Sequence, residues 1–223
     1  MKITNERFFK YRHFLALLSW LILLPWFGYL EKTTVPKFYM YSVIDNYIPF
    51  IKGFIIPYEL WYFYVFAGLL FLGFTSKKDF LKLQIYLFLC MSISYVIYML
   101  FPNAQNLRPA IRGNDILTNL IKLLYKIDTP TNVSPSIHVS DAIAVHLAFL
   151  KCSVTRNKKV LIWTSLILMI SICASTILIK QHSIIDVFGG ILLAGVLYFP
   201  IYELPKVIYN RSSKKEKQVI TQE

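Results

Sequence analysis

Long apolar stretches constrain the fold of this chain more than any other feature. A helix needs about 20 mostly apolar residues to cross the roughly 30 Å hydrocarbon core of a bilayer. Five stretches approach or meet this length, the last of them becoming apolar after its first few residues: 14–30, 57–74, 80–100, 160–179 and 183–202. A weaker stretch, residues 138–153, is interrupted by Ser140, Asp141 and His146. We predict that it also crosses, because the basic segment after it would otherwise lie on the wrong side. The fold class is therefore an all-α polytopic membrane protein with six transmembrane helices.

The composition excludes an ordinary soluble protein. Hydrophobic residues make up 56% of the 223 residues and charged residues only 16%, whereas soluble domains are about 45–50% apolar. The net charge of +12 does not indicate a nucleic-acid partner, because the basic residues lie in short blocks between apolar stretches. The three cysteines lie in or beside these stretches without metal-ligand spacing, so we expect them to pack as small apolar side chains.

The distribution of Lys and Arg predicts the orientation of the chain. Basic flanks stay on the cytoplasmic side of a membrane, and 16 of the 24 Lys and Arg residues fall in the N-terminal flank, two connecting segments and the C-terminal tail. These segments carry a net charge of about +11, against about +1 on the opposite side. We expect a multi-pass protein of the cell membrane with both termini in the cytoplasm.

The chain contains one membrane domain with two flanks. Residues 1–13 form the cytoplasmic N-terminal flank, residues 14–202 the membrane domain and residues 203–223 a basic cytoplasmic tail. Within the domain, one apolar stripe at helical spacing comprises Ile116, Leu117, Leu120, Leu124 and Ile127. This pattern predicts an amphipathic helix that lies in the outer membrane interface.

Polar side chains near membrane depth are costly, so their positions are informative. Arg108, His138, His182 and Asp186 all fall at the outer interface in this topology. His182 and Asp186 are four residues apart and share a helix face. The carboxylate can accept a hydrogen bond from one ring nitrogen and leave the other free as a nucleophile or base. An ordinary helix-start pair, with the acid favoured by the helix dipole, explains the same spacing.

A second candidate lies at the start of the weak stretch. Pro135, Ser136, Ile137 and His138 precede or begin a predicted helix. Ser136 can cap this helix while free backbone amides point outward, an arrangement that suits phosphate. A plain helix cap explains the pattern as well.

Three short motifs resemble, in the same order, those of the type 2 phosphatidic acid phosphatase superfamily. They are Asn106-Leu-Arg108-Pro109, Pro135-Ser136-Ile137-His138 and Lys180-Gln-His182-Ser-Ile-Ile-Asp186. The third motif is the most specific, and the resemblance covers about residues 45–202. It implies a six-helix membrane core with its site at one face.

The resemblance also implies a role for each residue. His182 would be the nucleophile that forms a phosphohistidine, Asp186 its orienting partner, and His138 the general acid that protonates the leaving alcohol. Arg108 would bind the phosphoryl oxygens, and Ser136 would add its hydroxyl and neighbouring amides. The family uses no metal and no other cofactor, and this sequence has no residue cluster with metal-ligand spacing.

Two positions depart from the family pattern. Phe101 and Thr176 occupy positions where the family usually has a lysine and an arginine that bind phosphate. The pattern is therefore closer to the branch resembling inositolphosphotransferases and sphingomyelin synthases. We expect Lys180, Arg112 or Lys122 to supply the lost charge, although a lysine that extends to the interface from a helix end explains Lys180 equally.

We therefore expect a metal-independent lipid phosphatase that hydrolyses a lipid phosphomonoester or pyrophosphate at the extracytoplasmic face. Its partners would be the bilayer and a lipid phosphate. A lipid phosphotransferase, which passes the group to an alcohol, and a non-enzymatic lipid-binding protein with a degenerate site are the alternatives. The presence of both histidines and Asp186 argues against the last.

Overall fold

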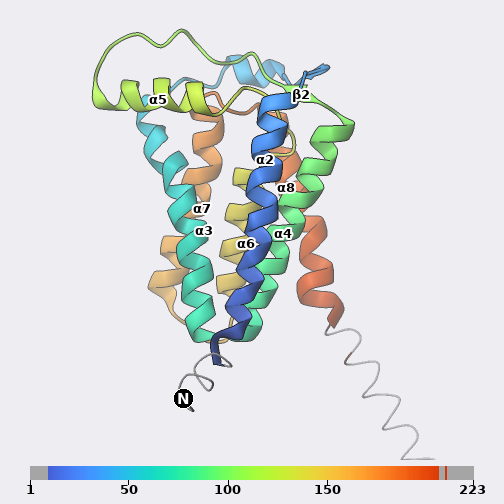
Figure 1. Ribbon diagram of the computed structural model, residues 1–223. Helices are drawn as coiled ribbons and strands as arrows, with labels where there is room; N and C mark the ends of the chain where they lie inside the picture. The colour runs from blue at the N-terminus through green and yellow to red at the C-terminus, as the bar shows by residue number, and fades with distance from the viewer. Residues whose placement is uncertain (1–9, 206–208, 210–223) are drawn as a thin grey trace, which may run out of the picture.

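The computed structural model describes residues 10–205 and 209 (Figure 1). Expectations for residues 1–9 and for nearly all of the tail after Pro205 lie outside the described residues. Five helical stretches are long and apolar enough to cross a membrane: Arg12–Thr33, Lys52–Thr75, Lys77–Leu100, Lys159–Leu178 and Ile184–Glu203. They coincide with the four clear apolar stretches of the sequence and with the fifth, residues 183–202. The prediction of an all-helical membrane protein is confirmed for these five helices.

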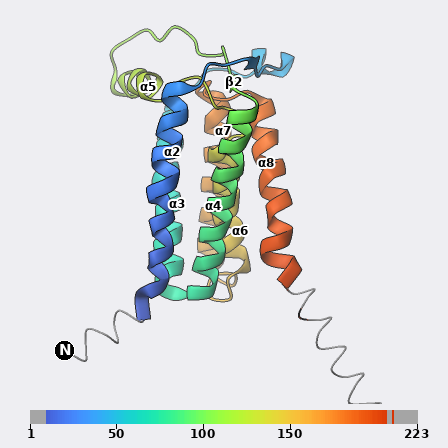
Figure 2. The ribbon, with the colours of Figure 1, turned by 45° about the vertical axis from the view of Figure 1, so that its right-hand side comes forward.

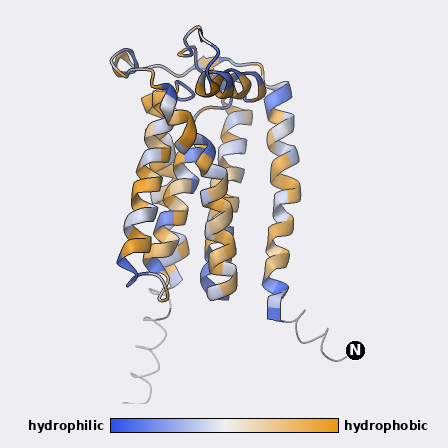
Figure 3. Cartoon of the chain, turned by 90° about the vertical axis from the view of Figure 1, so that its left-hand side faces the viewer, coloured by the Kyte–Doolittle hydropathy of each residue, from blue (hydrophilic) through white to orange (hydrophobic). Residues whose placement is uncertain are grey.

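The spanning stretches consist of the following elements. They are η1 (Arg12–Ser19) with α2 (Trp20–Thr33), η3 (Lys52–Phe54) with α3 (Ile55–Thr75), α4 (Lys77–Leu100), α7 (Lys159–Leu178), and α8 (Ile184–Tyr198) with the π-helical turn η4 (Phe199–Glu203). The other elements are β1 (Phe38–Tyr39), η2 (Val43–Asn46), β2 (Asn103–Ala104), α5 (Ile116–Ile127) and α6 (Ile137–Lys151). Apolar residues predominate along the helices of the bundle (Figure 3), and many large apolar side chains are exposed on its surface, as lipid contact requires.

Helix α6 is the centre of the bundle. It packs against α3, α4, α7 and α8, and its small residues Ala142, Ala144 and Ala148 are buried. Gly190 of α8 permits the closest approach, since a Cβ atom there would lie 2.6 Å from the Ser136 carbonyl oxygen. The interrupted polar pattern of this segment therefore belongs to a helix surrounded by other helices, where polar groups do not meet lipid.

A layer of short elements covers one end of the bundle (Figures 1 and 2). Helix α5 lies across this end, and β1 pairs with β2 in parallel, with Phe38 opposite Asn103 and Tyr39 opposite Ala104. The segments that precede α3, α5, α6 and α8 all meet here. We call this the loop end; it contains Arg108, His138, His182 and Asp186.

Helix α5 is amphipathic, but its buried face differs from the predicted stripe. Thr118, Ile121 and Leu124 face the bundle, where Ile121 and Leu124 join a small cluster with Ile55, Tyr58 and Ile179. Ile116, Leu120 and Ile127 are exposed instead. The predicted helix is present. One part of its apolar surface packs on the bundle, and the other part is exposed.

Candidate functional site

A cavity of about 250 Å³ lies at the loop end. It is lined by α2, α3, α4, the end of α5, the start of α6 and the segments that precede α6 and α8. Its lining residues are Trp20, Leu24, Phe27, Glu31, Tyr58, Trp61, Tyr62, Met91, Tyr95, Tyr98, Ile127, Asp128, Thr129, Thr131, Asn132, Val133, Ile137, His138, Gln181 and His182. Two of the three predicted catalytic residues, His138 and His182, are therefore in one cavity.

His182 is held by the main chain. Its Nδ1 atom lies 2.9 Å from the Val133 carbonyl oxygen and 3.6 Å from Asp186 Oδ2. Because a carbonyl only accepts, Nδ1 carries the hydrogen and Nε2 keeps its lone pair. The predicted hydrogen bond from the ring to Asp186 is not formed, and the carboxylate lies at ion-pair distance.

Asp186 caps α8. Its Oδ2 atom accepts a hydrogen bond from the Ser183 amide at 2.8 Å, within a capping box. Its second oxygen, Oδ1, is buried and has no partner among the described residues. Asp186 is therefore an ordinary acid at the start of a helix, and it also lies beside the imidazole of His182.

His138 lies in the first turn of α6 between two aromatic rings. Its ring stacks on Tyr58 with centroids 4.3 Å apart and lies 4.4 Å from the Trp61 ring. Its Nε2 atom is buried without a hydrogen-bond partner among the described residues. The His138 and His182 ring centroids are 6.0 Å apart in an edge-to-face arrangement, so both rings can contact one small group beside them.

Ser136 occupies the N-cap position of α6 but makes no side-chain cap bond. Its amide donates to the Asp186 carbonyl at 3.0 Å, which ties the start of α6 to α8. Its hydroxyl is buried without a partner among the described residues, and it does not line the cavity. The predicted cap hydrogen bond is therefore absent.

Arg108 binds the end of α5. Its Nη1 and Nη2 atoms donate to the carbonyls of Tyr125 at 3.1 Å and Asp128 at 2.7 Å, and the guanidinium lies 4.4 Å from the centre of the Tyr125 ring. Arg108 does not line the cavity. In this structure it satisfies helix C-terminal carbonyls, an arrangement that cations favour.

Lys180 also points away from the cavity. Its φ of 56° is the left-handed conformation that commonly ends a helix, and its Nζ donates to the carbonyls of Asp45 at 2.8 Å and Ile48 at 2.6 Å. Burial lowers the pKa of this lysine. The predicted phosphate-binding lysine thus anchors the loop before α3.

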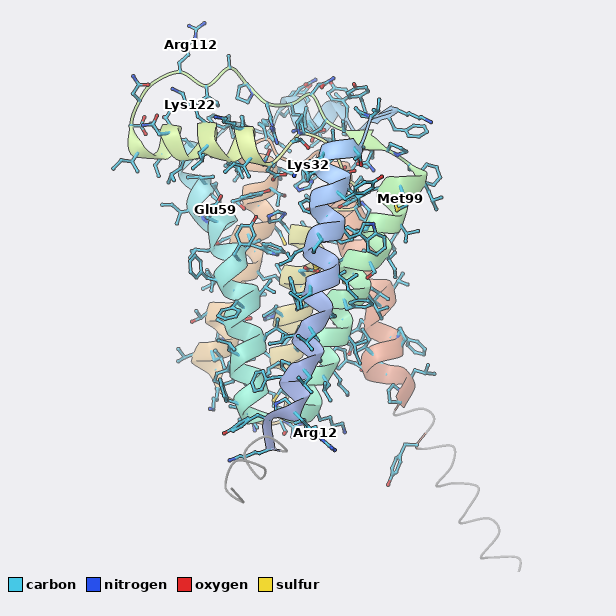
Figure 4. The ribbon with its side chains drawn as sticks, viewed as in Figure 1. Arg12, Lys32, Glu59, Met99, Arg112 and Lys122 are labelled. Atoms are coloured by element: carbon cyan, nitrogen blue, oxygen red, sulfur yellow. The ribbon has the colours of Figure 1, made fainter. Side chains whose placement is uncertain are left out.

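The other expected sources of positive charge lie outside the cavity as well. Arg112 extends from the long loop and Lys122 lies on α5 (Figure 4), where Lys122 Nζ donates to Gly113 and Asn114. Phe101 is at the end of α4 and contacts Phe38, with centroids 5.9 Å apart. In the part of the chain that the structure describes, no lysine or arginine lines the cavity.

Two acids in the cavity were missed by the sequence analysis. Asp128 Oδ2 accepts from the Tyr58 hydroxyl and from Gln181, each at 3.0 Å, while burial and the Glu31 carboxylate raise the pKa of Asp128 to about 6. Glu31 Oε2 accepts from the amide and the hydroxyl of Thr129. Glu31 lies in the last turn of α2 and Asp128 directly follows α5, but the sequence gives no sign that Glu31 meets Thr129, 98 residues later.

Asp45 is a third acid that the motifs did not include. Its two oxygens accept from the Ser183 hydroxyl at 2.6 Å and from the Ile184 amide at 2.9 Å. It therefore fixes the start of α8, directly after His182. The loop that contains Asp45 is thereby bound to the segment that positions the imidazole.

No group of three or more His, Cys, Asp or Glu side chains is arranged to hold a metal ion within residues 10–205. Comparisons of the chain with family models, curated proteins and solved structures find no match.

Proposed function

We propose that this protein is a membrane enzyme that cleaves a phosphate ester or pyrophosphate bond of a lipid through a phosphohistidine at His182. The observation that carries the proposal is the pair of histidines in one cavity, brought there by different parts of the chain. The Val133 carbonyl holds Nδ1 of His182, so Nε2 is the available nucleophile. The cavity also has the apolar walls that a lipid requires.

The two histidines divide the reaction between them. The Nε2 lone pair of His182 attacks phosphorus, and the bond from phosphorus to the leaving oxygen breaks. His138 gives its proton to that oxygen. Water then attacks the phosphorus of the phosphohistidine and gives a proton to His138, while the bond from phosphorus to Nε2 of His182 breaks. This step releases phosphate and restores both rings. The Asp186 carboxylate, 3.6 Å from Nδ1, stabilises the positive charge on His182.

Phosphate binding must differ from the pattern that the motifs imply. Arg108, Ser136 and Lys180 do not line the cavity, so the start of α6 is the remaining source of positive potential. Ile137 and His138 form its first turn and line the cavity. The free amides and dipole of a helix N-terminus attract phosphate.

A lipid phosphotransferase is the second candidate, and the charge of the cavity favours it. Glu31 and Asp128 line the cavity without a lysine or arginine among its described lining residues. Two carboxylates disfavour a doubly charged phosphomonoester more than a singly charged phosphodiester. A phosphodiester substrate would leave its headgroup phosphate on His182 for transfer to an alcohol.

The site would lie at the extracytoplasmic face of a six-helix membrane domain. Helix α6, with 15 residues, would be the sixth crossing, because it runs within the bundle from the loop end to the opposite end (Figure 1). Arg12 lies at that opposite end, whereas Arg112 and Lys122 lie at the loop end (Figure 4).

The test is incubation of the purified protein with a panel of phospholipids and polyprenyl diphosphates. Mass spectrometry follows released phosphate, which indicates hydrolysis, and any new phospholipid, which indicates transfer. His182→Ala should abolish turnover and any acid-labile phosphoenzyme. His146→Ala is the matched control, because His146 is in the same bundle but binds Ser165 at 3.0 Å outside the cavity. Substantial activity in His182→Ala would refute the proposal.

A further inference from the structure

The cavity changes from polar to apolar along its length. At the loop end its walls include Glu31, Asp128, Asn132 and the two histidines. Farther into the bundle the walls are Trp20, Leu24 and Met91, within helices that are apolar enough to cross a membrane. The gradient therefore follows the direction in which a bilayer changes from headgroups to acyl chains.

The deep end of the cavity is closed by hydrogen-bonded side chains. Trp20 Nε1 donates to Gln84 Oε1 at 3.2 Å, and Gln84 Nε2 donates to Ser19 at 2.9 Å. Gln84 is only 3% exposed. Trp20 and Glu31 lie 11 residues apart on α2, which corresponds to about 16 Å of helix. The cavity therefore reaches about halfway through a hydrocarbon core of roughly 30 Å.

The side of the cavity is open between α2 and α3. Three lining residues are exposed on the surface: Leu24 of α2 at 58%, Tyr62 of α3 at 55% and Ile127 of α5 at 69%. Helix α2 packs mainly on α4 and makes few contacts with α3. It stands at the edge of the bundle (Figure 3). We call this opening, framed by Leu24, Tyr62 and Ile127, the lateral mouth.

We propose that the lateral mouth admits a lipid directly from the bilayer, with its phosphate against His138 and His182 and one acyl chain along Leu24, Met91 and Trp20. The inference rests on the proposed function for the phosphate, but the acyl-chain path depends only on the cavity. Surrounding lipid is the occupant that fits an apolar opening at membrane depth. A water-soluble phosphate would have no use for the apolar half of the cavity.

Photolabelling tests the path without requiring turnover. The probe is phosphatidic acid with a diazirine near the end of one acyl chain, mixed into phosphatidylcholine vesicles that contain the full-length protein. We expect mass spectrometry to find the label on Trp20, Leu24 or Met91. Label confined to Ile22, which is 63% exposed on the opposite side of α2, would overturn the proposal even if the protein proves to be a phosphatase.

A matched pair of variants tests the mouth itself. Leu24→Trp should reduce labelling inside the cavity at least fivefold, whereas Ile22→Trp should leave it unchanged. In activity assays, Leu24→Trp should raise KM for phosphatidic acid more than KM for water-soluble nitrophenyl phosphate, which has no acyl chain to pass the lateral mouth. Equal labelling of the two variants, or equal slowing of both substrates by Leu24→Trp, would overturn the lateral mouth. Lack of turnover with correct labelling would refute the proposed function alone.

Discussion

His182 and Asp128 show how single residues in this protein depend on distant partners. The Val133 carbonyl, 49 residues before His182, sets which ring nitrogen carries the hydrogen. Because a carbonyl oxygen only accepts hydrogen bonds and carries no charge, it fixes this tautomer without a charged partner. Asp186 is left free to cap α8 and to provide charge.

Asp128 makes the folded protein sensitive to pH. Its pKa is raised from 3.8 to about 6 by burial and by Glu31, so the folded state favours the protonated form. The contribution of Asp128 to the free energy of unfolding therefore falls as pH rises from about 4 to 6, by at most about 3 kcal/mol. Above that range the contribution is constant. The Asn side chain in Asp128→Asn can still accept hydrogen bonds from Tyr58 and Gln181. The Tm of this variant should therefore rise relative to that of wild type as pH increases from about 4 to 6.

The measurement is thermal unfolding in detergent at several pH values. Asp115→Asn is the control, since a hydrogen bond from Lys52 holds the pKa of Asp115 below its usual range. Its Tm difference from wild type should therefore stay nearly constant above about pH 4. If the Tm difference between Asp128→Asn and wild type did not change with pH, the raised pKa of Asp128 would be contradicted.

The close approach of α6 and α8 depends on Gly190. A Cβ atom at Gly190 would lie 2.6 Å from the Ser136 carbonyl oxygen and 2.9 Å from Val139 Cβ. Gly190→Ala should therefore push α8 from α6 and destabilise the protein by about 1–3 kcal/mol. Gly195, on the same helix, has nothing within 4 Å of such an atom. Gly195→Ala should be neutral or stabilising, because alanine favours helix. Equal Tm values for the two variants would show that the helices adjust freely.

Hydrophobic patterns predicted the elements better than the directions of side chains. The four clear spans and the fifth, residues 183–202, follow from apolar length, and the strongly periodic residues 116–127 form α5. Which face of α5 is buried depends on Ile55 and Ile179, which lie far away in the sequence. The same reason explains Arg108 and Lys180: their positions near the site were predictable, but their carbonyl partners in other segments were not.

At the scale of the whole molecule, the two ends of the bundle differ in kind. The loop end contains the cavity, α5 and the acids Glu31, Asp45 and Asp128. The opposite end contains tight connections between helices, with the basic residues Lys77, Lys78, Lys151, Lys158 and Lys159. The acids of the site therefore lie opposite the end that the charge rule assigns to the cytoplasm.

This asymmetry predicts the orientation of the protein in the cell membrane. Asn114 lies in the exposed loop before α5, and Asn157 lies exposed between α6 and α7 at the opposite end. A cysteine at position 114 should react with an impermeant thiol reagent in intact cells, whereas one at position 157 should react only after permeabilisation. Wild type gives the background, because its cysteines are buried or half-buried. The reverse labelling pattern would place the cavity on the cytoplasmic side, where its lateral mouth would take lipids from the inner leaflet instead of the outer one.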